Sequence, residues 1–173
     1  FFLAQSNKQI TAFTTEPSGA GFKMIGEHQV HKGLFIIGIN FGPDGALYGA
    51  DWGNNPWAPH MNGRVIKLDD PALAGSPSRV ATSSLLAMDF AQAKSRALRN
   101  FITHPDQRIR LKAQFEFARR SETGELLDIA KNSKSQMVRI HALWGYGQLA
   151  RKRPSLAANL AALLTDPDPE IRS

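Results

Sequence analysis

The residues best suited to binding or catalysis lie close together between positions 51 and 63. This segment, rich in glycine and proline, carries a carboxylate (Asp51), an amide (Asn54), an imidazole (His60) and two indoles (Trp52 and Trp57). Such a set could bind a sugar or a hard cation, because cations of this kind take oxygen ligands and aromatic side chains line small-molecule sites. The alternative is a packed loop between strands, in which the tryptophans pack and Asp51 caps a turn.

The histidines offer two further kinds of site. His60 could act as a general base near neutral pH, but the sequence supplies no partner that would orient its ring. His28 and His31 lie three residues apart without a third ligand at a metal-binding spacing, which favours a surface position. Asp51 is therefore the candidate metal ligand. The sequence contains no GxSxG, HExxH, P-loop or GxGxxG motif, so the enzyme classes that depend on these motifs are not indicated.

Length and composition narrow the range of functions. The chain has 173 residues, of which 42% are hydrophobic and 21% charged, as in a globular protein of one domain or two small ones. No apolar run approaches the 18 residues of a membrane span. The absence of cysteine excludes disulfides, thiol catalysis and attachment of a c-type haem within these residues.

The net charge of +6 is concentrated in the second half of the chain. Residues 1–90 carry 6 Lys and Arg against 7 Asp and Glu, whereas residues 91–173 carry 15 against 8. Two basic runs stand out, Arg119-Arg120 and Arg151-Lys152-Arg153. At helix ends they would complement the helix dipole, and on an open surface they could bind phosphate or DNA. We expect them to form a protein-docking surface for an acidic partner, such as a cytochrome domain.

The first half of the sequence has the pattern of short strands. Glu16-Pro17-Ser18-Gly19 and Gly42-Pro43-Asp44-Gly45 have the composition of turns, and the second favours a tight hairpin. The segments between such turns are rich in β-branched and aromatic residues. They are 1–4, 10–15, 22–25, 34–41, 46–50 and 64–68. Strands at this spacing predict a β-sandwich or blades of a β-propeller. As a propeller they would supply one to two blades, which would make the chain a piece of a larger protein.

The second half has a repeated frame. Residues 104–110, 134–139 and 166–172 share a turn followed by an arginine, and a leucine lies twelve residues before each arginine. The spacing predicts paired helices of a HEAT-like α-solenoid, about two and a half repeats long. Asp106 and Asp168 are expected in the first turn of a helix, each paired with the arginine four residues later, and Ser135 is expected to cap the equivalent helix.

The two halves together resemble a known family. The stretch Asn40-Phe41-Gly42-Pro43-Asp44-Gly45-Ala46-Leu47-Tyr48-Gly49-Ala50-Asp51-Trp52, followed by residues 63–68, resembles the last blade of glucose/sorbosone-dehydrogenase-like propellers. A propeller followed by HEAT-like repeats resembles the large secreted dehydrogenase-like proteins of planctomycete and verrucomicrobial bacteria. The resemblance implies a mixed β-then-α fold. The end of a propeller would span residues 1–80, a linker 81–92 and a solenoid 93–173.

The resemblance also implies a function. It points to a fragment of a periplasmic or secreted sugar or alcohol dehydrogenase, with the solenoid docking an electron-acceptor protein or cytochrome domain. The alternative is a non-catalytic protein-interaction module, and nucleic acid is not an expected partner. The residues expected to bind substrate or cofactor are Asp51, Trp52, Asn54, Trp57, Arg64 and Lys8, with His60 as the catalytic candidate.

The cofactor implied by the resemblance is a quinone. In the soluble quinoprotein glucose dehydrogenases, two arginines just before the equivalent turn contact the quinone carboxylates. Phe35 and Ile37 occupy those positions here, so the arginine contacts do not carry over. A c-type haem, which follows in longer relatives, would lie outside this chain because the chain has no cysteine.

Overall fold

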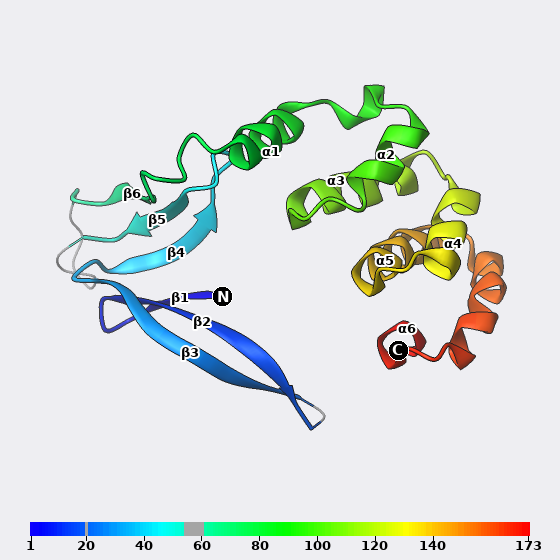
Figure 1. The fold of residues 1–173 in the computed structure, drawn as a ribbon, viewed down its shortest axis with the longest axis horizontal. Helices are drawn as coiled ribbons and strands as arrows, with labels where there is room; N and C mark the ends of the chain where they lie inside the picture. The colour runs from blue at the N-terminus through cyan, green and yellow to red at the C-terminus, as the bar shows by residue number, and fades with distance from the viewer. Residues whose placement is uncertain (20, 54–60) are drawn as a thin grey trace. The chain divides into compact units, whose positions relative to one another are not determined.

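A computed structural model describes residues 1–19, 21–53 and 61–173. The chain divides into two compact units, residues 1–83 and residues 84–173. The first unit is built mainly of strands and the second of helices, as the ribbon shows (Figure 1). Helix α1 (Pro77–Ala87) begins in the first unit and ends in the second, so helical structure occupies part of the segment expected to be a linker.

The first unit contains two antiparallel sheets of three strands each. One has the order β1 (Phe2–Gln5), β2 (Gln9–Ser18) and β3 (Gly21–Lys32). The other has the order β4 (Ile36–Phe41), β5 (Leu47–Asp51) and β6 (Arg64–Leu68). Among the described residues of the first unit, few apolar side chains are buried: Ile10, Ala12, Ile36, Ala46 and Leu47.

One of the two predicted turns lies where the sequence places it. Residues 42–45 join β4 to β5, the amide of Gly45 donates to the carbonyl oxygen of Gly42 at 3.0 Å, and Gly45 has φ +78°. The other prediction is displaced, because β2 continues through Pro17 and Ser18. Pro17 is tolerated there because β1 pairs with β2 only as far as Ala12, which leaves one edge of β2 open at the proline.

The second unit is helical after α1. Its elements are η1 (Phe90–Gln92), α2 (Ser95–Phe101), α3 (Gln107–Arg119), α4 (Thr123–Asn132), α5 (Gln136–Lys152), η2 (Pro154–Thr165) and α6 (Pro169–Arg172), where η marks a 3₁₀ helix. The predicted capping role of Ser135 is confirmed, whereas Asp106 and Asp168, expected in the first turn, lie at the N-cap just before it. Asp106, Ser135 and Asp168 each stand at an N-cap, and each side chain accepts a hydrogen bond from a backbone amide of the following turn.

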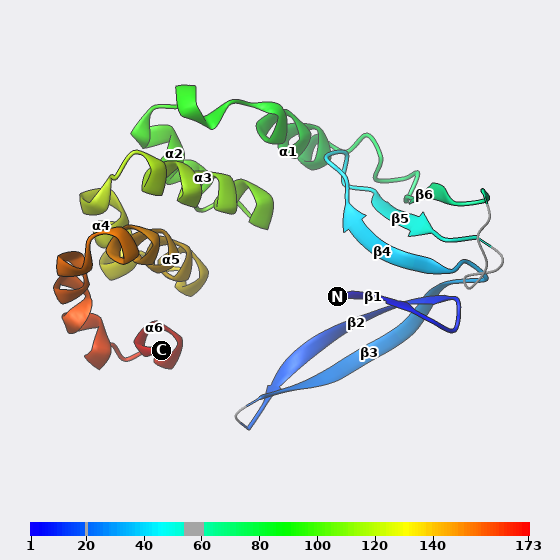
Figure 2. The same cartoon turned by 180° about the vertical axis from the view of Figure 1, so that it is seen from behind.

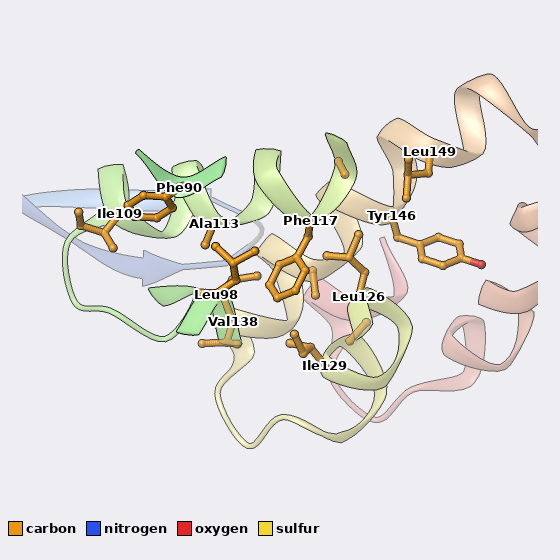
Figure 3. Packing of buried hydrophobic residues seen from close by; sticks show 14 of the residues in the cluster. Phe90, Leu98, Ile109, Ala113, Phe117, Leu126, Ile129, Val138, Tyr146 and Leu149 are labelled. Carbon is orange, nitrogen blue, oxygen red and sulfur yellow. The ribbon is translucent and has the colours of Figure 1, made fainter. Parts of the chain in front are cut away.

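A single hydrophobic cluster runs through the second unit. It takes buried side chains from η1 to α6, from Phe90 to Ile171. Figure 3 shows the ring of Phe117 among the side chains of Leu98, Leu126 and Ile129. Short helices such as α2, of 7 residues, and α4, of 10 residues, are stabilised mainly by this shared burial, since isolated helices shorter than about 12 residues are marginal. No helix in the described part of the chain has the length and apolar character needed to cross a membrane.

The predicted fold class is wrong. A propeller blade is one sheet of four antiparallel strands, whereas the strands here divide after β3 into two sheets of three. The helices gather on one core instead of forming a long HEAT solenoid, so the chain is a small mixed α/β protein. The physical reason is that strand spacing and a helix–turn–helix frame specify local hairpins only. They do not determine how many strands pair into one sheet or how many helices pack on one core.

The predicted pairs of Asp106 with Arg110 and of Asp168 with Arg172 do not form. Asp106 pairs with Arg108 at 2.7 Å. Arg110 instead donates to the carbonyl oxygens of residues 104 and 105, and Arg172 donates to those of residues 166 and 167. Each arginine thus binds the free carbonyls of the turn before its own helix.

The arginine of the middle frame behaves differently. Arg139 donates from Nε to the carbonyl oxygen of Ala130 at 2.7 Å, near the end of α4, and it forms an ion pair with Asp166 after η2. Both side chains of this pair are largely buried, with 12% and 10% exposed. Hydrogen bonding from Arg139 lowers the pKa of Asp166. The pair therefore joins the end of α4 to the segment between η2 and α6.

Candidate functional site

Asp51 is a structural carboxylate. It lies at the end of β5 with 4% of its surface exposed. Its Oδ1 accepts from the amides of Phe35 at 3.0 Å and Gly53 at 3.2 Å, and its Oδ2 accepts from Nε of Arg64 at 2.9 Å. These bonds tie the ends of β4, β5 and β6 together. Asp51 therefore has the turn-capping role that was the alternative to ligand binding.

The other predicted binding residues are distributed around this point. Arg64 contacts Asp51 and is otherwise exposed, and the amide of Trp52 donates to the carbonyl oxygen of Phe35 at 2.8 Å. Lys8 lies in the turn between β1 and β2 with φ +65°, in the sheet that does not contain Asp51. Asn54, Trp57 and His60 lie outside the described residues.

The described residues do not form a metal centre. Within residues 1–19, 21–53 and 61–173, no group of three or more His, Cys, Asp or Glu side chains is placed to hold an ion. His28 and His31 lie on β3, and Nδ1 of the exposed His28 is 2.9 Å from the carbonyl oxygen of Gly26. The two histidines are thus part of the strand surface.

An ion-pair network that the sequence did not indicate holds the turn between β4 and β5. Asp44 lies 2.8 Å from Nζ of Lys67 and accepts from the hydroxyl of Tyr48 at 2.9 Å. The hydrogen bond from Lys67 lowers the pKa of Asp44 to about 2, and the bond to Asp44 raises the pKa of Tyr48. Asp69 continues the network from Lys67 to Arg79. The network is structural because its charges are paired with one another.

Of the predicted docking residues, Arg120 is occupied inside the protein. Its Nε donates to Glu116 at 2.5 Å, and its Nη2 donates to three carbonyl oxygens at the end of η1. Only 20% of its side chain is exposed. Arg120 thus fastens α3 to η1 and offers little charge to a partner.

Arg119 shares the same carboxylate but faces outward. Its Nε and Nη2 donate to the two oxygens of Glu116 at 2.7 and 2.6 Å, while 62% of its side chain is exposed. Hydrogen bonds from both arginines lower the pKa of Glu116 to about 2, with that from Arg119 the stronger. Glu116 is therefore ionised at neutral pH, and both of its oxygens are hydrogen-bonded to Arg119 and Arg120.

The remaining predicted docking residues border a groove at the C-terminal ends of α3 and α5, two helices that contact each other and lie side by side in the opposite view (Figure 2). The groove has a volume of about 550 Å³. Arg119 lines it from α3, and Arg151, Lys152 and Arg153 line it from the end of α5. The structure thus brings four of the five predicted docking residues together.

Two aromatic side chains, not assigned to binding by the sequence pattern, are exposed on the same pair of helices. Phe115 on α3 is 52% exposed, and Trp144 on α5 is 54% exposed. Phe115 borders the cationic groove, whereas Trp144 borders a second hollow of about 390 Å³, lined by aliphatic side chains of α5 and η2 and by residues 170–173. Their equivalent positions, each five residues after the frame arginine, are the signal that could have identified them.

A buried polar pair lies beneath this surface. Nδ1 of His141 on α5 is 2.8 Å from Oε1 of Gln114 on α3, and both side chains are almost fully buried. Among the described residues, Nε2 of His141 has no hydrogen-bond partner. Burial, with a further contribution from the charge of Arg110, lowers the pKa of His141. The pair fixes the register of α3 against α5 and leaves no accessible nitrogen for catalysis.

No protein-family model matches the chain. Searches of curated proteins and of solved structures likewise return no match.

Proposed function

We propose that residues 84–173 are a protein-binding module whose partner lies across α3 and α5. The observation that carries this proposal is the exposure of Phe115 and Trp144 on two helices that also present Arg119, Arg151 and Lys152. Aromatic and arginine side chains dominate the binding energy of protein interfaces, and Lys and Glu are depleted there. The function is non-catalytic in the part of the chain described.

The geometry of the first unit favours this proposal over a catalytic one. Both carboxylate oxygens of the candidate residue Asp51 accept hydrogen bonds from other groups of the protein. Lys8 lies in the other sheet. The dehydrogenase activity implied by resemblance stays a prediction, to be tested with sugars or alcohols and an artificial electron acceptor.

Site-specific photocrosslinking tests the protein-binding proposal. A photoreactive phenylalanine analogue is placed at position 115, at position 144 and, as a control, at the exposed Lys131 on α4. Positions 115 and 144 should give the same discrete adduct, and position 131 should not. Mass spectrometry of the adduct identifies the partner.

The purified partner then supplies the quantitative test. The double variant Phe115→Ala, Trp144→Ala should bind it at least about tenfold more weakly than the wild-type chain, since exposed aromatic anchors are typical hot spots. Equal affinity of the double variant and the wild type would overturn the proposal, as would crosslinking from position 131 alone.

A further inference from the structure

The groove at the ends of α3 and α5 combines an apolar floor with a cationic rim. Phe115, Ala118 and Leu149 supply the apolar surface, and Ala118 and Leu149 are themselves almost fully buried. The other lining residues are Arg119, Ser121, Gln148, Arg151, Lys152 and Arg153. No lining residue is acidic, so the groove has one sign of charge.

The cations of the rim are open to solvent. Arg151, Lys152 and Arg153 are exposed, and none of their side chains has an ion pair or hydrogen bond to another described residue. Arg119 is paired with Glu116, whose two oxygens are taken by Arg119 and Arg120, and Asp89 also interacts electrostatically with Arg119. The protein therefore leaves three of the rim cations without internal compensation.

We propose that this groove binds an acidic segment of a partner protein, with aspartate or glutamate on either side of a leucine or an aromatic residue. The proposal rests on the proposed protein-binding function and specifies the chemistry of the partner. The acidic side chains would pair with the rim, and the apolar side chain would lie against Phe115 and Leu149. Charge complementarity of this kind sets orientation and association rate, while the apolar contact supplies most of the affinity.

The arrangement fits an acidic peptide better than a nucleic acid. A nucleic-acid strand requires a track of cations that follows successive phosphates. Here the open cations are grouped at one end of α5, and an apolar floor lies beside them. An acidic segment with one apolar residue satisfies both parts of the groove.

Fluorescence anisotropy with defined probes tests the proposal on the full chain. The main probe is a labelled twelve-residue peptide with a central Leu-Trp pair between blocks of Asp and Glu. One comparison peptide replaces every acidic residue with Gln, and another keeps the acidic residues and replaces Leu-Trp with Ser-Ser. A twelve-nucleotide oligothymidine of single-stranded DNA is the polyanion control. The main peptide should bind at least about tenfold more tightly than any of these.

Charge-reversal variants place the binding at the groove. The triple variant Arg151→Glu, Lys152→Glu, Arg153→Glu should lose at least about tenfold in affinity. The matched control, Lys94→Glu, Lys131→Glu, Lys134→Glu, changes the net charge equally at exposed positions outside the groove and should stay within about twofold of wild type. The variant Phe115→Ala should bind the Leu-Trp and Ser-Ser peptides alike. Circular dichroism verifies that each variant is folded.

With the defined probes, any of these outcomes would overturn the proposal: equal losses in the two triple variants, equal binding of the Leu-Trp and Ser-Ser peptides, or tighter binding of DNA. Its failure is distinguishable from failure of the proposed function. If the crosslinked partner binds the Arg151–Arg153 triple variant as tightly as wild type, the protein-binding function stands and the acidic segment is wrong. If no partner crosslinks at positions 115 and 144, the broader function fails.

Discussion

The carboxylate of Glu116, on α3, accepts a hydrogen bond at 2.5 Å from Nε of Arg120, the C-cap residue of the same helix. The same guanidinium donates through Nη2 to the carbonyl oxygens of Phe90, Ala91 and Ala93, at 3.0, 3.1 and 2.7 Å. A carboxylate with 8% of its side chain exposed thus holds an arginine in place to cap the end of another helix. Arg119 and Arg120, although adjacent in sequence, therefore differ: Arg120 binds the end of η1, whereas Arg119 faces solvent.

Replacing Arg120 should destabilise the second unit more than replacing Arg119. Arg120→Met removes the carbonyl contacts to η1 and one bond to a buried carboxylate, at a cost of about 2 kcal/mol in the free energy of unfolding. Arg119→Met removes a side chain that is mostly exposed, so its effect on the free energy of unfolding should be smaller. Urea unfolding followed by circular dichroism at 222 nm compares the two. Equal losses would contradict a special role for Arg120.

Mild acid should destabilise the second unit through His141. Because burial lowers the pKa of His141 in the folded chain, the unfolded chain binds its proton first as the pH falls. The stability associated with neutral His141 is present above the unfolded pKa of 6.5 and is lost as the pH falls below it towards the lower folded value. The melting temperature of the wild type should therefore decrease between pH 7.5 and 5.5.

The variant His141→Gln provides the control for this pH dependence. Glutamine cannot titrate, so the variant should be less stable at pH 7.5 and show a smaller decrease towards pH 5.5. An unchanged pH profile in His141→Gln would show that other groups are responsible.

Two glycines on α5 should respond oppositely to alanine. A Cβ at Gly147 meets no atom within 4 Å, so Gly147→Ala should stabilise the helix by about 1 kcal/mol. A Cβ at Gly145 would lie 3.0 Å from Cδ2 of the buried Leu126 and 3.2 Å from Cγ of Gln114. Gly145→Ala should therefore lower the melting temperature, while Gly147→Ala raises it. A rise in both variants would show that α3 and α4 can move away from α5.

Asp51 should prove necessary for stability without binding calcium. Asp51→Ala leaves the amide of Phe35 without its acceptor and Arg64 without its partner, which should cost about 1 to 3 kcal/mol. Tryptophan fluorescence in a Trp144→Phe background reports the unfolding of residues 1–83, which contain the other two tryptophans. Millimolar calcium chloride should leave the wild-type transition unchanged. A calcium-dependent rise would restore the metal-ligand interpretation of Asp51.

Local features of the fold could be predicted from sequence because their causes are local. Asp106 and Ser135 cap helices through side-chain oxygens that reach amides two or three residues away. Gly45 occupies a left-handed conformation that a tight turn requires. The larger assembly could not be predicted, because the division of strands after β3 depends on which strands pair, and hairpin patterns leave that choice open.

The sequence predicted where the basic residues of the candidate site lie, but not which contacts each side chain makes. The run Arg151-Lys152-Arg153 was expected at a helix end, and α5 ends there. Nothing in the pair Arg119-Arg120 reveals that one guanidinium faces solvent and the other contacts η1, because that depends on helix phase and on a segment about 30 residues earlier. Asp51 was similarly indistinguishable from a ligand until its three internal donors were located.

The ion pair between Arg139 and Asp166 has a consequence for partial unfolding. Detaching η2 and α6 from the second unit would leave the guanidinium of Arg139 without its counter-ion, in a position where only 12% of the side chain is exposed. Such an opening has a high free energy. The protected amides of the last 20 residues should therefore exchange their hydrogens with solvent together with those of α4 and α5. The C-terminal segment, although short and partly 3₁₀, is therefore expected to belong to the same cooperative unit as the longest helix of the protein.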